Sequence, residues 1–220
     1  MAVAHATERN HIYVWQAPVR LAHWVHVAAM LVLAVTGYYI GRPFIVAAGD
    51  VATQNVMATM RTMHAVAAMF LGVSWITRAY WAVVGNRYAR LSGLLPLTRR
   101  RWRDFWRMAA YYIFLSSRRP EYLGHNPIAG LSYFLLYLLV FLEGITGLAL
   151  YAEYFPGGLM YTLFGWVWAL GANNNIVRMV HHLLMWVFLA FFLLHLYLAV
   201  LNDLIEGSGV NSSIITGYKN

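Results

Sequence analysis

Two histidines lie near opposite ends of one long apolar segment in the C-terminal part of the chain. His181 and His195 both belong to the run Arg178–Val200, which consists mostly of leucine, phenylalanine and other apolar residues. They are fourteen residues apart, so in an α-helix they fall on nearly the same face, roughly 21 Å apart along the axis. Ionisable side chains are costly inside a membrane and usually face the interior of a helix bundle, where they mark a functional path. The spacing therefore predicts a transmembrane helix with two ligand positions at different depths.

An earlier segment of the chain repeats this arrangement. The two segments correspond at three positions: Arg61 with Arg178, His64 with His181, and Arg78 with His195. A second repeat relates Val35-Thr-Gly37 to Ile145-Thr-Gly147. Such internal repeats are typical of membrane folds built from related helical hairpins. They predict that His64 and His181 lie at equivalent depths.

This pair of histidines has the residue type and placement of axial haem ligands. Two neutral imidazoles that converge at one depth between helices are what a b-type haem requires, because each supplies one nitrogen to the iron. A single histidine within a membrane is often only a hydrogen-bonded interior residue. The repeat around His64 and His181 argues against that interpretation for both.

The composition indicates a small integral membrane protein. Of the 220 residues, 61% are hydrophobic and only 11% are charged, which is too apolar for a soluble domain. The absence of cysteine excludes iron–sulfur clusters, thioether-attached haem, thiolate metal sites and disulfides from this chain. Any iron–sulfur relay must therefore come from a partner. The first apolar span begins near Val19, after a polar segment, so we expect no cleaved signal peptide.

We predict an all-α, single membrane domain over residues 1–220, with four transmembrane helices in a bundle and haems between the helices. The expected spans, judged by length and apolar composition, are 19–40, 62–84, 127–151 and 177–201. The connection 85–126 carries nine of the sixteen basic residues. Because positively charged loops stay in the cytoplasm, this loop and both termini are expected to be cytoplasmic, and the loops 41–61 and 152–176 external.

Two of the connecting segments are expected to lie along the membrane surface. Trp102 and Trp106 stand among the arginines of the basic loop, which predicts an interfacial amphipathic helix rather than a nucleic-acid site. The apolar run Leu159–Leu170 is too short to cross and favours an interfacial or partner-facing helix. Tyr13 and Trp15 are expected to anchor the N-terminal segment at the interface.

The expected depths of the histidines predict which of them pair. His64 and His181 open the second and fourth spans on the external side, whereas His23 opens the first span and His195 lies late in the fourth, on the cytoplasmic side. We therefore expect two haems, one per leaflet. His23 and His26 share a helix face, so geometry does not choose between them, and His26 is the better candidate for a histidine at the water interface. The roles of Glu143 and His125 stay open.

Several separated motifs resemble those of one protein family. They are Ala17-Pro-Val-Arg-Leu-Ala-His23-Trp, Arg61-Thr-Met-His64, Arg78-Ala-Tyr-Trp-Ala-Val-Val-Gly-Asn-Arg87, Gly124-His-Asn-Pro127, His181 with Met185-Trp186, and Thr216-Gly-Tyr218. Together they are similar to the b-type cytochrome subunit of membrane-bound nickel–iron hydrogenases. The similarity covers nearly the whole chain.

This resemblance implies a four-helix anchor in the inner (plasma) membrane that holds two haems b. Such a subunit takes electrons from the iron–sulfur small subunit of a hydrogenase, whose large subunit holds the nickel–iron centre, and passes them to quinone. It has no hydrogen-activating centre of its own. Carried over by position, the ligand pairs are His64 with His181 and His23 with His195. At the position of Arg178 relatives often have another histidine, which puts the propionate partners in doubt.

Three arginines are candidate partners of these groups. Arg61 and Arg178 stand one turn before their histidines, where guanidinium groups bind haem propionates bidentately, although simple interfacial snorkelling explains them equally. Arg78 lies at the depth of His195 and, with Tyr197 and His23, is expected to donate hydrogen bonds to a quinone carbonyl or a propionate.

Two alternative functions are considered, one within the same class of protein and one from a different class. One is a cytochrome b anchor for another periplasmic dehydrogenase, such as formate dehydrogenase. The other is a haem-free membrane anchor or small transporter whose histidines serve structure or proton movement. A visible spectrum separates the cytochromes from the second, because two low-spin haems per chain belong only to the former.

Overall fold

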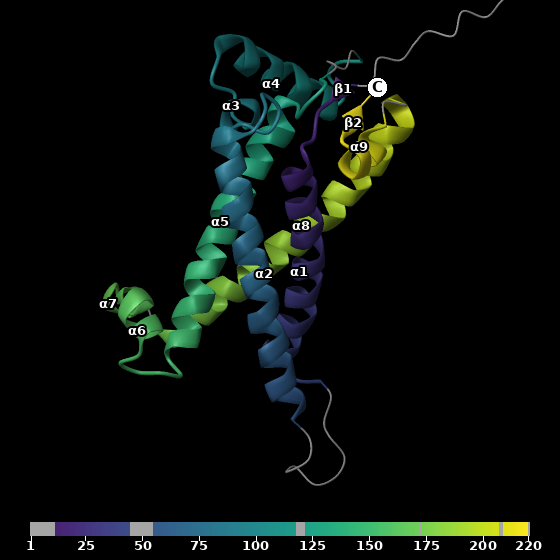
Figure 1. Ribbon diagram of the computed structural model, residues 1–220. Helices are drawn as coiled ribbons and strands as arrows, with labels where there is room; N and C mark the ends of the chain where they lie inside the picture. Colours follow the sequence, from purple (N-terminus) through teal and green to yellow (C-terminus); the bar gives the residue numbers. More distant parts are fainter. Residues whose placement is uncertain (1–11, 45–54, 118–121, 172, 207–208, 220) are drawn as a thin grey trace, which may run out of the picture. The chain divides into compact units, whose positions relative to one another are not determined.

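Four long helices make up most of the computed structural model, which describes residues 12–44, 55–117, 122–171, 173–206 and 209–219 (Figure 1). They are α1 (Ala17–Gly41), α2 (Val56–Val84), α5 (Pro127–Ala152) and α8 (Asn174–Glu206). Each contains an apolar stretch long enough to cross a membrane. The predicted all-α fold with four membrane spans is therefore confirmed. Whether the whole chain forms one membrane domain, and which loops are cytoplasmic, stays a prediction.

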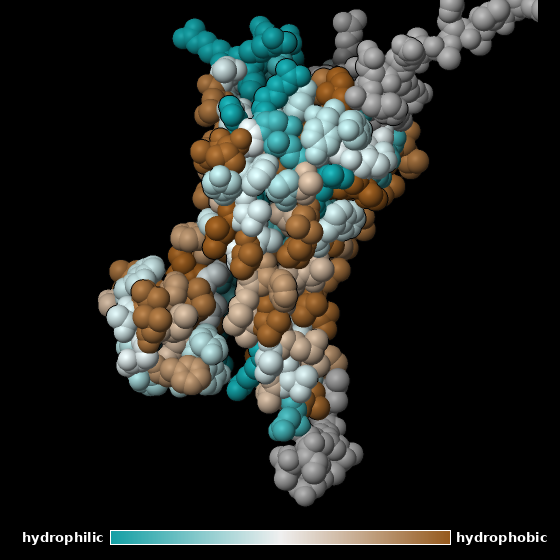
Figure 2. Space-filling model, viewed as in Figure 1, coloured by the Kyte–Doolittle hydropathy of each residue, from teal (hydrophilic) through white to brown (hydrophobic). Residues whose placement is uncertain are grey.

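Shorter elements fill the connections. They are β1 (Ile12–Tyr13), α3 (Leu91–Leu94), α4 (Arg99–Tyr112), α6 (Leu159–Phe164), α7 (Trp166–Ala169), α9 (Val210–Thr216) and β2 (Tyr218–Lys219). The helix expected in the basic loop is present as α4, over which hydrophilic side chains gather in Figure 2. The run Leu159–Leu170 forms two short helices rather than one, with the break at Gly165.

Polar residues just before the helices explain where they begin. The Asn126 side chain accepts the N–H of Ala129 at 2.8 Å, and Pro127 occupies the first position of α5, where its missing N–H costs nothing. The Asn173 side chain caps α8 in the same way, 2.9 Å from the N–H of Ile176. These caps place the helix starts at or before the starts predicted from apolar composition.

The membrane-length helices expose their large apolar side chains. Among those on α2, Met69, Phe70 and Val73 are all more than 60% exposed, and Figure 2 shows hydrophobic side chains along these helices. In water such exposure would be unfavourable. It is the surface expected of helices that face lipid.

The described chain forms two compact units, residues 1–21, 78–131 and 194–220 in one and residues 22–77 and 132–193 in the other. In the first unit β1 pairs antiparallel with β2, so that Tyr13 lies opposite Tyr218. The carbonyl of Gly217 accepts the N–H groups of Val14 and Trp15 at 2.9 and 3.1 Å. The two ends of the described chain are therefore joined within this unit.

The prediction that Trp15 anchors the chain at the membrane interface is wrong. Its side chain is only 8% exposed, packs with Val14, Val19 and Ala89, and donates its indole N–H to Ser213 Oγ at 3.2 Å. The physical reason is the strand pairing, which draws this segment into a core that the sequence pattern does not reveal. Tyr13, at 41% exposure, keeps its side chain at the surface.

In the second unit, the pair α6 and α7 covers the adjoining ends of α5 and α8. Val167 of α7 is buried in a cluster with Ala149 of α5 and Val177 of α8. Ile145, Leu150, Phe164 and Trp168 pack around this cluster. The same unit contains His64 and His181, so these packed helices set the frame in which the two imidazoles meet.

Candidate functional site

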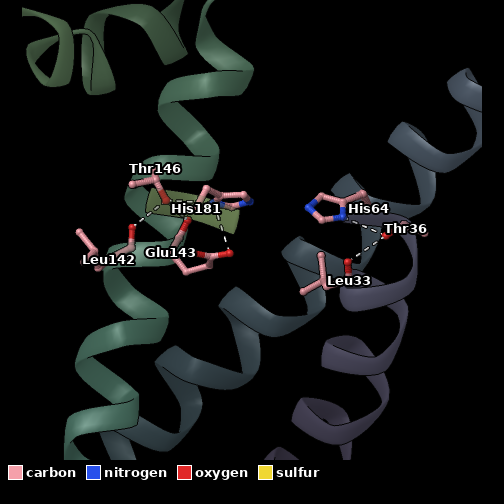
Figure 3. Close-up of polar contacts among 7 residues, drawn as sticks. All are labelled: Leu33, Thr36, His64, Leu142, Glu143, Thr146 and His181. Carbon is pink, nitrogen blue, oxygen red and sulfur yellow. Dashed lines mark hydrogen bonds and ion pairs between the residues drawn. The ribbon is translucent and has the colours of Figure 1, made fainter. Parts of the chain in front are cut away.

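His64 of α2 and His181 of α8 face one another in the second unit. Their ring centroids are 6.3 Å apart, with an angle of 62° between the ring planes. Figure 3 shows each ring turning one nitrogen toward the other histidine. The structure thus brings together the two histidines that the internal repeat predicted at equivalent depths.

A threonine hydroxyl orients the His64 ring. Thr36 Oγ1 lies 2.9 Å from His64 Nδ1 and 2.7 Å from the carbonyl oxygen of Val32 one turn earlier in α1 (Figure 3 draws the His64 contact). A carbonyl only accepts, so the hydroxyl donates its single hydrogen there and accepts the N–H of the imidazole. His64 therefore carries its hydrogen on Nδ1 and leaves the lone pair of Nε2 available to a metal.

The His181 ring is held in the same way. Thr146 Oγ1 lies 3.0 Å from His181 Nδ1 and 3.1 Å from the carbonyl oxygen of Leu142 one turn earlier in α5. By the same reasoning His181 also presents Nε2 as its free lone pair. The repeated Thr-Gly pairs are thus the residues that orient the two histidines. The repeat was visible in the sequence, but this role of the threonines was not predicted from it.

The glycine after each threonine makes room for the imidazole. A Cβ atom at Gly37 would lie 3.1 Å from His64 Cε1, and one at Gly147 would lie 3.1 Å from His181 Cε1. These distances are shorter than ordinary van der Waals contact. Each Thr-Gly pair therefore combines a hydrogen-bond acceptor with the space in which the ring can reach it.

One residue distinguishes the two halves of this site. Glu143 Oε1 lies 3.3 Å from His181 Nδ1, and both side chains are largely buried, at 18% and 17% exposure. In the repeat register that pairs Thr146 with Thr36, the position of Glu143 corresponds to Leu33. The His64 half therefore has an apolar side chain where the His181 half has a carboxyl group.

The geometry of the pair fits a haem. In the part of the chain that the structure describes, no group of three or more His, Cys, Asp or Glu side chains is placed to hold a metal ion. Two imidazoles would fill only two coordination positions of an iron, and the nitrogens of a porphyrin would fill the others. With metal–nitrogen bonds of about 2 Å and ring centres about 1.1 Å beyond each nitrogen, two axial imidazoles have centres about 6 Å apart. The observed separation of 6.3 Å matches this value.

Arg61 and Arg178, the predicted propionate partners of this pair, lie on the same two helices as its histidines. The Arg61 guanidinium stacks over the ring of Tyr154, 5.5 Å from its centroid, an arrangement that favours a cation beside an aromatic face. Arg178 is exposed on α8. Their role as propionate partners stays a prediction. His182 lies against Gly41 at the end of α1.

The second predicted pair is divided between the two units. His23 belongs to one unit and stacks edge-on against Trp24, with centroids 5.1 Å apart, while His195 belongs to the other. Their pairing stays a prediction. His26, the better candidate for a histidine at the water interface, has its Nδ1 2.7 Å from both Ser74 Oγ and the carbonyl oxygen of Ala22, and its depth in the membrane stays a prediction. This histidine is bound between α1 and α2.

In the first unit, Arg78 and His125 lie in the same polar region. Arg78 is only 5% exposed. The His125 ring packs against Trp15, with centroids 4.7 Å apart. Burial, followed by the positive charge of Arg78, lowers the pKa of His125 to about 3. His125 is therefore neutral at pH 7.

The comparisons with known proteins agree with this geometry. Residues 14–217 match the model of the family described as prokaryotic cytochrome b561. The chain is 39% identical over 217 residues, covering 97% of this chain and 91% of the relative, to the "Probable Ni/Fe-hydrogenase B-type cytochrome subunit" of Rhizobium leguminosarum bv. viciae. It is 37% identical over 220 residues to the protein of the same name from Azotobacter vinelandii, covering 96% and 90%. It is also 36% identical to the "Probable Ni/Fe-hydrogenase 1 B-type cytochrome subunit" of Escherichia coli K12, covering 94% and 90%.

Proposed function

The chain belongs to the prokaryotic cytochrome b561 family, and we propose that it anchors a nickel–iron hydrogenase and passes that enzyme's electrons through two haems b to membrane quinone. Membership makes it a multi-pass membrane protein of the b-type cytochrome class, which binds haem b. The observation that carries the proposal is the facing pair His64 and His181, with an orienting threonine behind each ring.

When bound, haem b supplies a one-electron carrier held between two imidazoles. The chain's own residues prepare that position. Thr36 and Thr146 hold the Nδ1 hydrogens, so both Nε2 lone pairs point to the space between α2 and α8. The apolar helices around the pair exclude water, which stabilises the neutral imidazoles that iron requires.

The proposed partners are the small, iron–sulfur subunit and the large, nickel–iron subunit of a hydrogenase. The relatives carry the hydrogenase in their names. The chain contains no cysteine, so an iron–sulfur electron donor must belong to another subunit. The segment α6–α7 offers a surface for such a partner, because Leu159, Leu163 and Trp166 are all about half exposed or more.

The second half of the electron path is proposed from the sequence. His23 and His195 are the ligands of the second haem, and Arg78 with its buried guanidinium binds the quinone or a propionate near them. We place the protein in the inner (plasma) membrane with both termini in the cytoplasm, because the basic residues are concentrated in the connection 85–126. Quinone reduced at the cytoplasmic side takes its protons from the cytoplasm.

Sealed proteoliposomes test this function. The purified complex of this chain with its hydrogenase is inserted with a voltage-sensitive dye, hydrogen is added, and quinone reduction is followed together with the membrane potential. We expect reduction that generates a potential, because charge crosses the membrane between hydrogen oxidation outside and quinone reduction inside. Quinone reduction without a potential would place the quinone site on the external side, and no hydrogenase co-purifying with the chain would contradict the partnership.

A further inference from the structure

We propose that Glu143 makes His181 the more strongly donating of the two axial ligands and thereby lowers the reduction potential of the haem held by His64 and His181. The proposal rests on the function proposed above and adds a tuning residue to it. Glu143 positions and polarises the ligand and does not itself touch the iron.

The internal repeat allows the surroundings of the two histidines to be compared position by position. Each half supplies an imidazole, a threonine hydroxyl at 2.9 or 3.0 Å from Nδ1, and a glycine whose added Cβ would lie 3.1 Å from the ring. The position three residues before the threonine differs in chemistry, because it is Leu33 in one half and Glu143 in the other (Figure 3). The His64 half therefore supplies a reference ring that has no carboxyl group at this position.

The carboxyl group is directed at the ligand. Glu143 Oε1 lies 3.3 Å from His181 Nδ1, beside the Thr146 hydroxyl, which lies 3.0 Å from the same nitrogen. The other oxygen, Oε2, is buried and has no hydrogen-bond partner among the described residues. Within that part of the chain, His181 is thus the polar side chain that the carboxyl group contacts.

A carboxyl group at this depth has no structural explanation in its surroundings. Placing an acid within a membrane helix is unfavourable, and an apolar residue fills the equivalent position beside His64. Intramembrane acids typically mark function. Its contact with His181 indicates that Glu143 acts on the histidine proposed to bind the haem.

The contact has a defined electronic effect. A carboxyl oxygen beside Nδ1 attracts the hydrogen of that nitrogen electrostatically, which increases the electron density on Nε2 and strengthens its donation to iron. Stronger donation stabilises the oxidised iron relative to the reduced iron. The low dielectric between the helices strengthens this interaction. The closeness of Oε1 to Nδ1 suffices, and no change in the protonation of Glu143 is needed.

A lower potential at this haem has a functional consequence. Electrons pass spontaneously from a carrier of lower potential to one of higher potential, so a haem tuned downward gives its electron readily to the next carrier. If the second haem has no carboxyl beside a ligand, the difference directs electrons away from the His64 and His181 position and toward quinone.

Two reciprocal substitutions test the proposal, because the repeat provides a matched control. Glu143→Leu gives the His181 half the residue of the His64 half, and Leu33→Glu gives the His64 half a carboxyl group. The midpoint potentials of both haems are measured by redox titration of the α band in the purified complex. We expect Glu143→Leu to raise one midpoint potential by at least about 59 mV, which for one electron is a tenfold change in the ratio of reduced to oxidised haem. Leu33→Glu is expected to lower the same potential. The potential in Glu143→Gln, which keeps an oxygen acceptor, is expected between those of the wild type and Glu143→Leu.

An unchanged potential in Glu143→Leu with both haems retained would overturn the proposal. If Glu143→Leu loses the haem, the test rests on Leu33→Glu. A midpoint potential that stays the same or rises in Leu33→Glu would then overturn the proposal. Loss of the haem in both variants would also contradict it, because Leu33 already serves the His64 half. A wild-type chain without bis-histidine haem would instead overturn the proposed function. The haem spectrum therefore separates the two failures.

Discussion

At the scale of residues, the candidate site is built from hydrogen bonds that fix the tautomer of two histidines. Each threonine hydroxyl donates its hydrogen to a backbone carbonyl of its own helix, at 2.7 Å for Thr36 and 3.1 Å for Thr146. What remains is an acceptor for the imidazole N–H, in the manner of the outer-shell partners that orient metal-binding histidines. The tautomers of both histidines therefore depend on the threonine side chains that contact them.

Replacing Thr36 or Thr146 by valine should weaken haem binding. Valine has nearly the same shape but no acceptor, so the imidazole loses its orienting bond, and we expect haem affinity to fall by about tenfold or more. Haem retained per chain after gel filtration measures the effect. Thr77→Val is the control, because the Thr77 hydroxyl donates to the Val73 carbonyl of its own helix at 2.9 Å. An equal loss of haem in the control would contradict the assigned role.

Alanine at Gly37 or Gly147 should displace the adjacent histidine. The added Cβ would lie 3.1 Å from the ring in either case, whereas alanine at Gly144 meets no atom within 4 Å. We expect Gly37→Ala and Gly147→Ala to lose haem. Gly144→Ala should retain both haems and stabilise its helix by about 0.5–1 kcal/mol. Thermal unfolding and the haem spectrum measure the two effects, and full haem content in all three variants would show that the glycines are not needed.

The neutral His125 should make the protein sensitive to acid. Its pKa is about 3 in the folded chain, against an ordinary value of 6.5, so between these values the unfolded chain binds a proton that the folded chain does not. Stability is complete above about pH 6.5 and is lost as the pH falls toward 3. From pH 7 to pH 5, the unfolding temperature of the wild type should fall more than that of His125→Gln. Equal decreases would contradict this assignment.

At the scale of elements, the long helices could be predicted and the small ones could not. Apolar length alone identifies four spans, which the structure extends to Ala17–Gly41, Val56–Val84, Pro127–Ala152 and Asn174–Glu206. The strand pair between Ile12–Tyr13 and Tyr218–Lys219 was missed, because two-residue strands from opposite ends of a chain leave no periodic pattern. The same pairing explains why Trp15 is buried.

Gly217 provides the test of this strand pair. Its φ of +94° is one that residues with a side chain rarely adopt, and an added Cβ would lie 2.6 Å from Tyr13 Cε2. Gly217→Ala should therefore separate β1 from β2 and expose the N-terminal segment to limited proteolysis. Gly171→Ala is the control, because Gly171 also has a positive φ, of +78°, but nothing within 4 Å. Equal protection of both variants would show that the strand pair contributes little.

The pairing of the histidines shows where sequence reasoning ends. The repeat predicted that His64 and His181 meet, and they do, because two copies of one pattern place equivalent residues at equivalent depths. It also contained Thr36 and Thr146, but their contacts to the rings depend on how neighbouring helices pack. The side chain of His26 is bound by Ser74 of a neighbouring helix. No pattern within one helix reveals such a partner.

At the scale of the whole molecule, the chain is a membrane cytochrome with four helices long and apolar enough to span a membrane. A chain that is 61% hydrophobic, has no cysteine and belongs to the prokaryotic cytochrome b561 family can hold haem but no iron–sulfur cluster. Any iron–sulfur centre that donates electrons to it must therefore belong to another subunit. We propose that His64 and His181 bind one haem from its two sides.

The haem content of ligand variants tests this claim most directly. The pyridine haemochrome assay and the low-spin spectrum of purified His181→Ala and His64→Ala are compared with those of His182→Ala, whose side chain lies against Gly41 rather than His64. The account predicts two haems in the wild type and in His182→Ala, and one low-spin haem in either ligand variant. Retention of both haems in His64→Ala and His181→Ala would contradict it.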